Sequence, residues 1–589
     1  MASRSLVFVL AAAAACGDDA NDSRDDGSGA PTLTMTATLT ATNTAPMATD
    51  SATGEPTDGG VTGSASQTVP TATTASEPSG TSGPTDTGLL DTGPDASGTT
   101  ETKFDVSGGS ASDTDMTTGP PVDQCKVSDD MDAIGDCGME APADSFEPEL
   151  QWSWPGQGGD IYAVTTPLVA NLTDDNGDGE IDLCDVPDIV VAVGPDFFGS
   201  AGHIYVLDGA TGTLHFQITT GVDPTNTPAL GDIDGDGLPE IVAALPTGQG
   251  GNPVAFEHDG TLKWQSPSGW PGAYIAAFAL ADLDNDGDVE ILGGNQVWDH
   301  TGALVFTAPA GAPLYSATAA ADLDEDGDLE VVIGATAFHH DGSVHYQTNI
   351  QPGFPQVANL DGDPQPEVLV TNPGGLTLLE HDGAVKYQDL RPTGDPAGAL
   401  TWFRPATVQD FNGDDVSDYA VSSGNNYTTY RADASIIWKA PVSDQSGIAA
   451  GTAFDFLGDG IAEAMYADEM FMFVFGGSGE VLLSQPRTSL TGTEYPIVAD
   501  VDNDGSAEIV VVSNMFGNGS SPPVQVIRDK MDRWIQARRI WNQHTYHVTN
   551  VREDGTIPQF EKPSWKSLNT FRTNAQIEGG GLCEPPIPQ

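Results

Sequence analysis

Acidic residues recur through this 589-residue chain at a spacing that suits the binding of a hard cation. The pattern D-x-[D/N]-x-D-G-x-x-[D/E] occurs in eight related copies, of which GDIDGDGLPE, ADLDNDGDVE and ADVDNDGSAE are clear examples. Oxygen atoms at positions 1, 3, 5 and 9, with the backbone carbonyl of position 7, can surround one ion, and glycine at position 6 permits a sharp turn. About six to eight oxygens at about 2.3–2.6 Å suit Ca²⁺ better than Mg²⁺, which demands a tight octahedron. The spacing therefore predicts calcium-binding loops.

Four copies carry the complete pattern, and we number them by their order in the chain as loops 2, 3, 4 and 8. The expected ligands of loop 2 are Asp232, Asp234, Asp236, Glu240 and the carbonyl oxygen of Leu238. The expected ligands of loops 3, 4 and 8 are, in turn, Asp282, Asp284, Asp286 and Glu290; Asp322, Asp324, Asp326 and Glu330; and Asp500, Asp502, Asp504 and Glu508.

The other four copies depart from the pattern. In loop 6 the ligands are Asp410, Asn412, Asp414 and Asp418, with Asp415 at the glycine position. Loop 1 has Asp174, Asn176 and Asp178, and an insertion leaves its closing ligand open among Asp182, Asp185 and Asp188, of which Asp182 and Asp188 are our candidates. Loop 5 has Pro364 in place of glycine, and loop 7 has Leu457 at its second ligand position. We expect metal in loops 1, 2, 3, 4, 6 and 8, and not in loops 5 and 7.

Clusters of Asp and Gly also form ordinary turns, in which the aspartate side chain hydrogen-bonds to the backbone. Eight copies in register, each closing on Asp or Glu and entering an apolar strand, favour metal binding over turns alone. Carboxylates held so close together repel one another strongly unless a cation lies between them. Chelation is therefore expected to lower the melting temperature substantially.

The segments around the loops indicate an all-β fold. The third acidic positions of successive loops are 58, 50, 40, 37, 51, 45 and 45 residues apart, a period typical of propellers and solenoids. A short strand-like segment precedes each loop, a β-branched run such as EIVVV follows, and a hairpin such as AFEHDGTLKW completes the unit. Four short antiparallel strands make one propeller blade. We predict a β-propeller of about eight blades, with seven as the alternative, closed by VQVIRDKMDRWIQ or by ELQWSWPG at 149–156.

These phrases resemble FG-GAP/VCBS repeats, which are related to the β-propeller of integrin alpha subunits, and the resemblance covers about residues 145–540. It implies structural Ca²⁺ in loops at the blade edges and ligand binding on a propeller face. The resemblance does not imply which ligand is bound.

The N-terminal sequence MASRSLVFVLAAAAACGDD indicates export. One cation precedes an apolar run that is too short to span a bilayer, which is typical of a secretory signal. The ending of residues 1–16 resembles a bacterial lipobox, so Cys16 is expected to carry a lipid anchor; an ordinary signal peptide is the alternative. Residues 17–122 are rich in Thr, Ser, Gly, Pro and Asp, and are expected to form a disordered tether. We expect a lipid-anchored protein of the bacterial cell envelope, at the outer membrane or cell surface.

The rest of the chain divides into a cysteine-containing segment at 123–144, the propeller at 145–535 and a basic tail at 536–589 that docks on the propeller. The stretch DKMDRWIQARRIWNQHTYHV, which leads from the propeller into the tail, is expected to be a helix or an extended final strand. Four cysteines beyond Cys16 favour two disulfides with three possible pairings. We expect the pairs to be Cys125 with Cys137 and Cys184 with Cys583.

The formal net charge of −66, from 20 Lys+Arg and 86 Asp+Glu, excludes a general nucleic-acid binder. No GxSxG, HExxH, Walker or CxxC motif is present, so no catalytic or cofactor-binding residue is assigned. We expect a binding or adhesion module for an extracellular protein or glycan. The alternatives are a calcium-dependent polysaccharide lyase or hydrolase with a site on a propeller face, and a ligand site formed by His544, His547 and Arg539 of the tail.

Overall fold

The computed structural model describes residues 125–126, 134–142, 145–197, 200–309, 315–515, 519–578 and 581–584. The predicted signal peptide at 1–16, its Cys16 and the predicted tether at 17–122 lie outside these residues. Within the described ranges, no helix has the length and hydrophobicity needed to cross a membrane. The helices found there are three short 3-10 turns, η1 (Thr247–Gln249), η2 (Val548–Asn550) and η3 (Ser564–Lys566).

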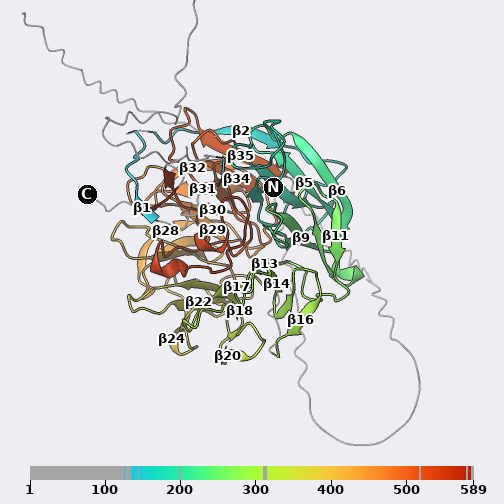
Figure 1. The fold of residues 1–589 in the computed structure, drawn as a ribbon. Helices are drawn as coiled ribbons and strands as arrows, with labels where there is room; N and C mark the ends of the chain where they lie inside the picture. The colour runs from blue at the N-terminus through green and yellow to red at the C-terminus, as the bar shows by residue number, and fades with distance from the viewer. Residues whose placement is uncertain are drawn as a thin grey trace, which may run out of the picture. The chain divides into compact units, whose positions relative to one another are not determined.

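Eight four-stranded antiparallel sheets form the blades of a β-propeller (Figure 1). The prediction of an all-β fold with eight blades is therefore confirmed. First strands of neighbouring blades contact one another along the series from β3 to β33, so these strands surround the central axis. In order from the first strand to the fourth, the blades are β3 (Leu168–Ala170), β4 (Asp188–Val193), β5 (Gly202–Asp208) and β6 (Leu214–Val222); β8 (Ala229–Gly231), β9 (Glu240–Ala244), β10 (Pro253–Phe256) and β11 (Leu262–Gln265); β13 (Ala279–Ala281), β14 (Glu290–Gly293), β15 (Gln296–Trp298) and β16 (Leu304–Thr307); β17 (Ala319–Ala321), β18 (Glu330–Val332), β19 (Thr336–Phe338) and β20 (Val344–Gln347); β21 (Phe354–Ala358), β22 (Glu367–Asn372), β23 (Gly375–Glu380) and β24 (Val385–Leu390); β25 (Thr407–Gln409), β26 (Asp418–Ser422), β27 (Asn426–Tyr430) and β28 (Ile436–Pro441); β29 (Gly451–Phe454), β30 (Glu463–Ala467), β31 (Phe471–Phe475) and β32 (Val481–Pro486); and β33 (Ile497–Ala499), β34 (Glu508–Val512), β35 (Val524–Asp529) and β2 (Pro148–Trp154).

The burial of the strands falls from the axis to the rim. The second strands β9, β22 and β34 are buried at every residue, because neighbouring blades cover both of their faces. This explains their continuous apolar runs, such as EIVVV in β34. The fourth strands alternate between exposed and covered residues, as in β24 and β32. The hydrophobic core is therefore formed by the inner strands of adjacent blades.

An aromatic side chain on a fourth strand packs on the hairpin of the next blade. A Cβ atom added to Gly302 lies 2.5 Å from the indole of Trp264, and one added to Gly479 lies 2.9 Å from the indole of Trp438. Both glycines have a positive φ of 81°, which side chains rarely adopt. The hairpin glycines therefore allow both the turn and the close approach of the next blade. Trp264 and Trp438 are blade-packing residues.

The ring is closed by both segments proposed from the sequence. The strand β35 is the third strand of the last blade, and the N-terminal strand β2 pairs antiparallel with it as the fourth. The last blade therefore combines the two ends of the repeat region. Outside the blades, the structure contains the sheet β1 (Ile134–Asp136), β37 (Gly581–Glu584) and β36 (Ile577–Glu578), and the pair β7 (Asn226–Thr227) and β12 (Ala276–Ala277).

The disulfide pairing predicted from the sequence is wrong. Cys125 bonds to Cys184, and Cys137 bonds to Cys583. The second bond lies beside the parallel pairing of β1 with β37, which brings the segment before the propeller next to the C-terminal residues. The local pairing of Cys125 with Cys137 does not form, because Cys125 lies against loop 1 whereas Cys137 lies beside the C-terminal strand β37.

The chain after β35 enters the centre of the propeller, and we call residues 533–577 the plug. The prediction of a helix or an extended final strand at its start is wrong, because the segment is irregular and makes isolated bridges. It contacts the first strands of seven blades and, in the fourth blade, the residue just before the first strand. The contacts are Trp541 with Val169 of β3, Asn542 with Leu230 of β8, Gln543 with Leu280 of β13, Thr545 with Thr318 before β17, η3 with β21, Phe571 with Val408 of β25, Arg572 with Thr452 of β29, and Asn574 with Val498 of β33.

Candidate metal-binding loops

Each acidic loop connects the first strand of a blade to the second. Its closing acidic residue is the first residue of the second strand and lies opposite the last residue of the first strand. Directly opposed residues in antiparallel sheets have Cα atoms about 4.5–5.5 Å apart, so strand pairing fixes the closing carboxylate at the base of its loop. The eight closing residues are Asp188, Glu240, Glu290, Glu330, Glu367, Asp418, Glu463 and Glu508.

Loop 2 shows how the ligand residues are gathered. The carboxylate of Asp232 accepts hydrogen bonds from the amides of Gly235 and Gly237 at 2.7 and 2.9 Å. The closing Glu240 accepts one from the amide of Ile233 at 2.9 Å. One oxygen from each of Asp232, Asp234 and Glu240 then lies within 4.8 Å of the other two. This convergence of hard oxygens is the donor set that Ca²⁺ prefers.

The backbone of the loops is left-handed at two positions. Position 4 has a φ between 56° and 81° in all eight loops. At position 6 the glycines of loops 1, 2, 3, 4, 7 and 8 have φ between 84° and 100°. Asp415 of loop 6 adopts 60° at this position, whereas the ring of Pro364 in loop 5 fixes a negative φ. Loop 6 therefore keeps the turn without its glycine, and loop 5 does not.

Burial and mutual repulsion make the carboxylates of the loops difficult to ionise. In loop 3, burial together with the charges of Asp284 and Asp282 raises the pKa of Glu290 to about 8. In loop 8, burial raises the pKa of Glu508 well above its ordinary value. Two buried oxygens of loop 8, Oε1 of Glu508 and Oδ1 of Asp502, have no hydrogen-bond partner. Buried, unpartnered and mutually repelling carboxylates fit the binding of a cation.

A β-bulge in each fourth strand places one side chain at the loop of the same blade. In the second blade the pairing of β10 with β11 shifts between Leu262 and Trp264, so Lys263 occupies the bulge. The same shift occurs in the other seven blades. Bulges commonly redirect a side chain in this way. From the first blade to the eighth, the bulge residues are His215, Lys263, Val305, His345, Lys386, Ile437, Leu482 and Gln151.

Two of the bulge residues are lysines that bind the loop carboxylates. The ammonium of Lys263 contacts Asp234, and it lies 3.2 Å from the closing Glu240 and 3.0 Å from Glu257. Although burial opposes it, hydrogen bonding to these groups raises the pKa of Lys263 above its ordinary value, so the side chain stays charged. Loops with a lysine at the bulge therefore contain a cation of their own.

Lys386 repeats this arrangement in loop 5, with Asp361, with Glu367 at 2.7 Å and with Glu380 at 3.0 Å. In loop 3 the bulge residue is Val305, and among the described residues no cation contacts the four acidic ligands of that loop. The bulge position was missed from the sequence, although the related phrases LHFQ, LKWQ, VHYQ and VKYQ contain the signal.

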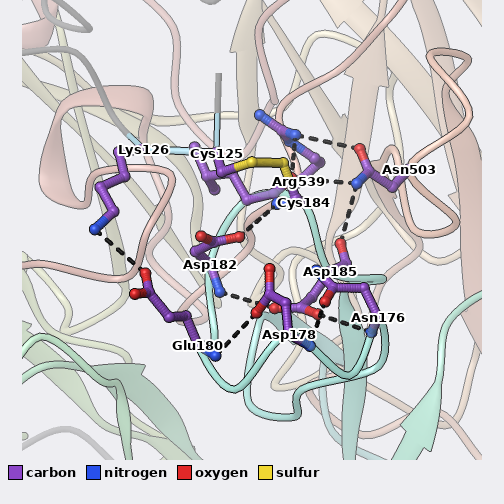
Figure 2. Close-up of a disulfide and its surroundings, with 11 residues drawn as sticks. Cys125, Lys126, Asn176, Asp178, Glu180, Asp182, Cys184, Asp185, Asn503 and Arg539 are labelled. Carbon is purple, nitrogen blue, oxygen red and sulfur yellow. Dashed lines mark hydrogen bonds and ion pairs between the residues drawn. A yellow bond between two sulfur atoms is a disulfide. The ribbon is translucent and has the colours of Figure 1, made fainter. Parts of the chain in front are cut away.

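The structure of loop 1 shows how the three candidate closing residues, Asp182, Asp185 and Asp188, are placed (Figure 2). Asp174 accepts hydrogen bonds from the amides of Gly177 and Gly179, as Asp232 does from its own loop. The amides of residues 175 and 176 donate to Asp185, at 3.0 and 3.1 Å, which is the bonding that a closing carboxylate shows in the other loops.

The structure therefore adds Asp185 to the ligand candidates of loop 1. Asp188 is the closing residue by strand pairing, and it accepts a hydrogen bond from the amide of Leu172 at 2.9 Å. Asp182 instead accepts from the amide of Cys184, beside the disulfide (Figure 2). Spacing alone could not identify Asp185, because the insertion folds back on itself.

The structure does not bring His544, His547 and Arg539 to one ligand site. His544 is completely buried, neither of its ring nitrogens has a hydrogen-bond partner, and burial lowers its pKa well below the ordinary value. His547 binds Glu561 at 2.6 Å, and Arg539 binds Glu553 at 2.8 Å. These residues hold the plug in place.

The fold defines a class, the eight-bladed β-propeller. Residues 232–293, which contain loops 2 and 3, match the family model of the FG-GAP-like repeat. No curated protein sequence matches the chain.

Among solved structures, the chain is similar to the V. cholerae biofilm matrix protein Bap1, with 22% identity and a TM-score of 0.63 over 75% of this chain and 100% of that chain. A Bacillus licheniformis rhamnogalacturonan lyase aligns with 17% identity and a TM-score of 0.45 over 65% of this chain and 75% of that chain. Bap1 therefore shares the fold.

Proposed function

We propose that this protein is a calcium-stabilised propeller that binds an extracellular glycan or protein at the bacterial cell envelope. The observation that carries the calcium assignment is the convergence of carboxylates in loops 2 and 4, with the buried unpartnered oxygens of loop 8. The ligands would be those predicted from the sequence, with Asp185 added in loop 1. Bound Ca²⁺ would neutralise these carboxylates and hold the first and second strands together.

The face opposite the loops supports the binding role. Tyr162, Tyr274 and Tyr315 precede the first strands of three blades, and they are half-buried against one apolar cluster. Tyrosine rings of this kind present a flat apolar face with a polar tip, which suits the stacking of a sugar ring or the burial of a protein side chain. The structural similarity to a biofilm matrix protein is consistent with such a role, and we assign the tyrosine face as the main binding surface.

Glycan-array binding of the full chain tests this proposal, with turnover of the same glycans measured in parallel. We expect binding without turnover, and we expect Y274A and Y315A to weaken it, whereas Tyr387→Ala on the fourth strand of blade 5 leaves it unchanged. Turnover of any polysaccharide would favour the lyase or hydrolase alternative. Full binding by the double variant Y274A/Y315A would remove the tyrosine face from consideration.

The lipid anchor is a separate part of the proposal, and it rests on the lipobox-like sequence before Cys16. We expect Cys16→Ala to release the protein from the membrane fraction into the soluble fraction. Cys125→Ala in the same assay controls for loss of a cysteine as such. Continued membrane association of C16A would contradict the anchor.

A further inference from the structure

A cavity of about 240 Å³ lies in the C-terminal segment, and its lining is cationic in a strongly acidic protein. Four of its ten lining residues are basic, namely Arg538, Arg552, Lys562 and Lys566, and none is acidic. The whole chain has 20 basic residues against 86 acidic ones. One fifth of the basic residues therefore surround a single small cavity, which is an arrangement that favours an anion.

The cavity lies on the loop face of the propeller. Lys566 forms an ion pair with Glu325 of loop 4 at 2.7 Å. Thr556 forms a bridge with Asp232 of loop 2, and Gln559 donates to the backbone of Asn285 in loop 3. The segment that carries the cavity is thus attached to three neighbouring loops.

Arg538 provides a buried charge whose hydrogen-bond partners are all uncharged. It is 3% exposed, and its guanidinium donates to Val548 O at 2.7 Å, Val551 O at 2.5 Å and the hydroxyl of Tyr546 at 3.0 Å. Its Nε atom has no hydrogen-bond partner. Among the described residues, no carboxylate lies within ion-pair distance of this guanidinium. A buried cation without a counter-ion is costly, and an anion in the adjoining cavity would offset that cost.

Two carboxylates near the lining residues already have partners of their own. Glu325 binds Lys566, and Glu561 accepts hydrogen bonds from His547 and Thr549 at 2.6 and 3.0 Å. The rim residue Arg552 makes a backbone hydrogen bond to Thr556, and its guanidinium has no ion-pair partner among the described residues. The charge of Arg552 is therefore available to a ligand.

The remaining wall is apolar. Val548, Leu568 and Leu582 belong to one small hydrophobic cluster and line the cavity together with Pro563. Leu582 precedes Cys583, whose disulfide to Cys137 attaches this wall to the segment before the propeller. The cavity thus combines cations, an apolar wall and a volume suited to one sugar ring. An acidic sugar has both a carboxylate and an apolar ring face, whereas an inorganic anion lacks the second.

We propose that this cavity binds one carboxylate-bearing sugar residue of an acidic glycan, with the carboxylate toward Arg538 and Arg552 and the ring against Leu568 and Pro563. This site is separate from the tyrosine face, which lies on the opposite side of the propeller. It gives the protein a preference for anionic glycans that the net charge of the chain would not predict.

Calorimetric titration of the full chain in millimolar calcium, with a glucuronate-containing tetrasaccharide, tests the site. The methyl ester of the same tetrasaccharide is the neutral control ligand, and inorganic phosphate and sulfate are separate arms. We expect R552Q to weaken binding of the acid by roughly 10-fold or more, because a charge-assisted hydrogen bond is lost. The matched control Arg431→Gln removes an exposed arginine from the hairpin of blade 6 and should leave binding unchanged.

Ser567→Trp blocks the rim of the cavity without altering a charge, and it should weaken binding as strongly as R552Q does. Weakening by both variants, with weak binding of the ester, supports the proposal. Equal binding of the acid by S567W and wild type would overturn it, as would tight binding of phosphate or sulfate without binding of the sugar. If Y274A/Y315A loses glycan binding and R552Q does not, this inference fails while the proposed function stands.

Discussion

Loops 2 and 3 have the same acidic ligands in adjacent blades, but they balance their charge differently. In loop 2 the bulge residue Lys263 reaches the closing Glu240, whereas in loop 3 the same position is Val305. Burial raises the pKa of both closing carboxylates, Glu240 and Glu290, to about 8, so the two loops differ in the lysine and not in these pKa values. One side chain on the fourth strand thus separates a loop that contains an internal cation from a loop that has none among the described residues. The acidic pattern alone therefore does not determine whether a loop contains a cation.

The largest expected effect is that of removing calcium from the whole protein. Chelation with EDTA should lower the melting temperature by on the order of 10 °C, because several sites that bind only the folded chain each contribute about 1–3 kcal/mol. Differential scanning calorimetry with and without excess Ca²⁺ measures this change. Addition of Mg²⁺ in place of Ca²⁺ is the control and should restore little. An unchanged melting temperature in EDTA would contradict the calcium assignment.

The pH dependence of the metal-free protein should reflect the closing carboxylates of both loops, because burial also raises the pKa of Glu240 to about 8. Glu290 has a pKa raised from 4.5 to about 8 in the folded protein, so folding favours its protonated form. Its contribution to stability is complete below about pH 4.5 and is lost as the pH rises through about 8. The metal-free protein should therefore melt several degrees lower at pH 9 than at pH 6, by an order-of-magnitude argument. Calcium should suppress this loss and release protons on binding at pH 7, which titration in buffers of different ionisation enthalpy detects.

Exchanging the bulge residues should exchange the behaviour of the two loops. Lys263→Met should destabilise the metal-free protein by roughly 2 kcal/mol, because buried carboxylates lose their charged hydrogen-bond partner. Val305→Lys should stabilise the metal-free protein and weaken calcium binding at loop 3, because the ammonium competes with the ion for the same carboxylates. Chemical denaturation in EDTA and calcium titration by calorimetry measure the two effects. The exchange Ile437→Met on blade 6 serves as the control for packing at a bulge, and unchanged calcium affinity in V305K would refute the internal-cation interpretation.

The smallest expected effect concerns the turn of loop 6. Asp415 has a φ of 60° where six other loops have glycine. Asp415→Gly should stabilise the protein by about 0.5–1 kcal/mol, because glycine adopts this conformation without the strain of a side chain. Asp414→Gly, one residue earlier, is the comparison and should instead remove a ligand. A loss of stability in D415G would show that the aspartate makes an interaction worth more than the strain.

The fold was predictable because each blade repeats the same local signals. The acidic turn and the hairpin glycines are both required by the backbone, so they recur in the sequence at the period of one blade. The candidate ligands of loops 2, 3, 4 and 8 were recognisable for the same reason, and their role in binding metal stays a prediction.

Features that depend on distant parts of the chain were not predictable. The disulfide of Cys125 with Cys184 requires that the segment before the propeller lies against loop 1, which no local pattern reveals. The assignment of Asp185 depends on how an insertion folds, and the position of Lys263 depends on a bulge two strands away from its loop. The course of the plug was missed because its apolar residues follow neither a helical nor a strand period.

The plug has a consequence for the order of folding. Residues 533–577 fill the space between all eight first strands, and β2 from the other end of the repeat region completes the last blade. A ribosome or a translocation channel releases these residues after the first strands of all eight blades, so the plug cannot make its contacts until the repeat region has emerged. Contacts between such distant segments form slowly. A chain of this design would therefore keep an open centre, and so remain easier to thread through a pore, until the plug segment has followed the blades.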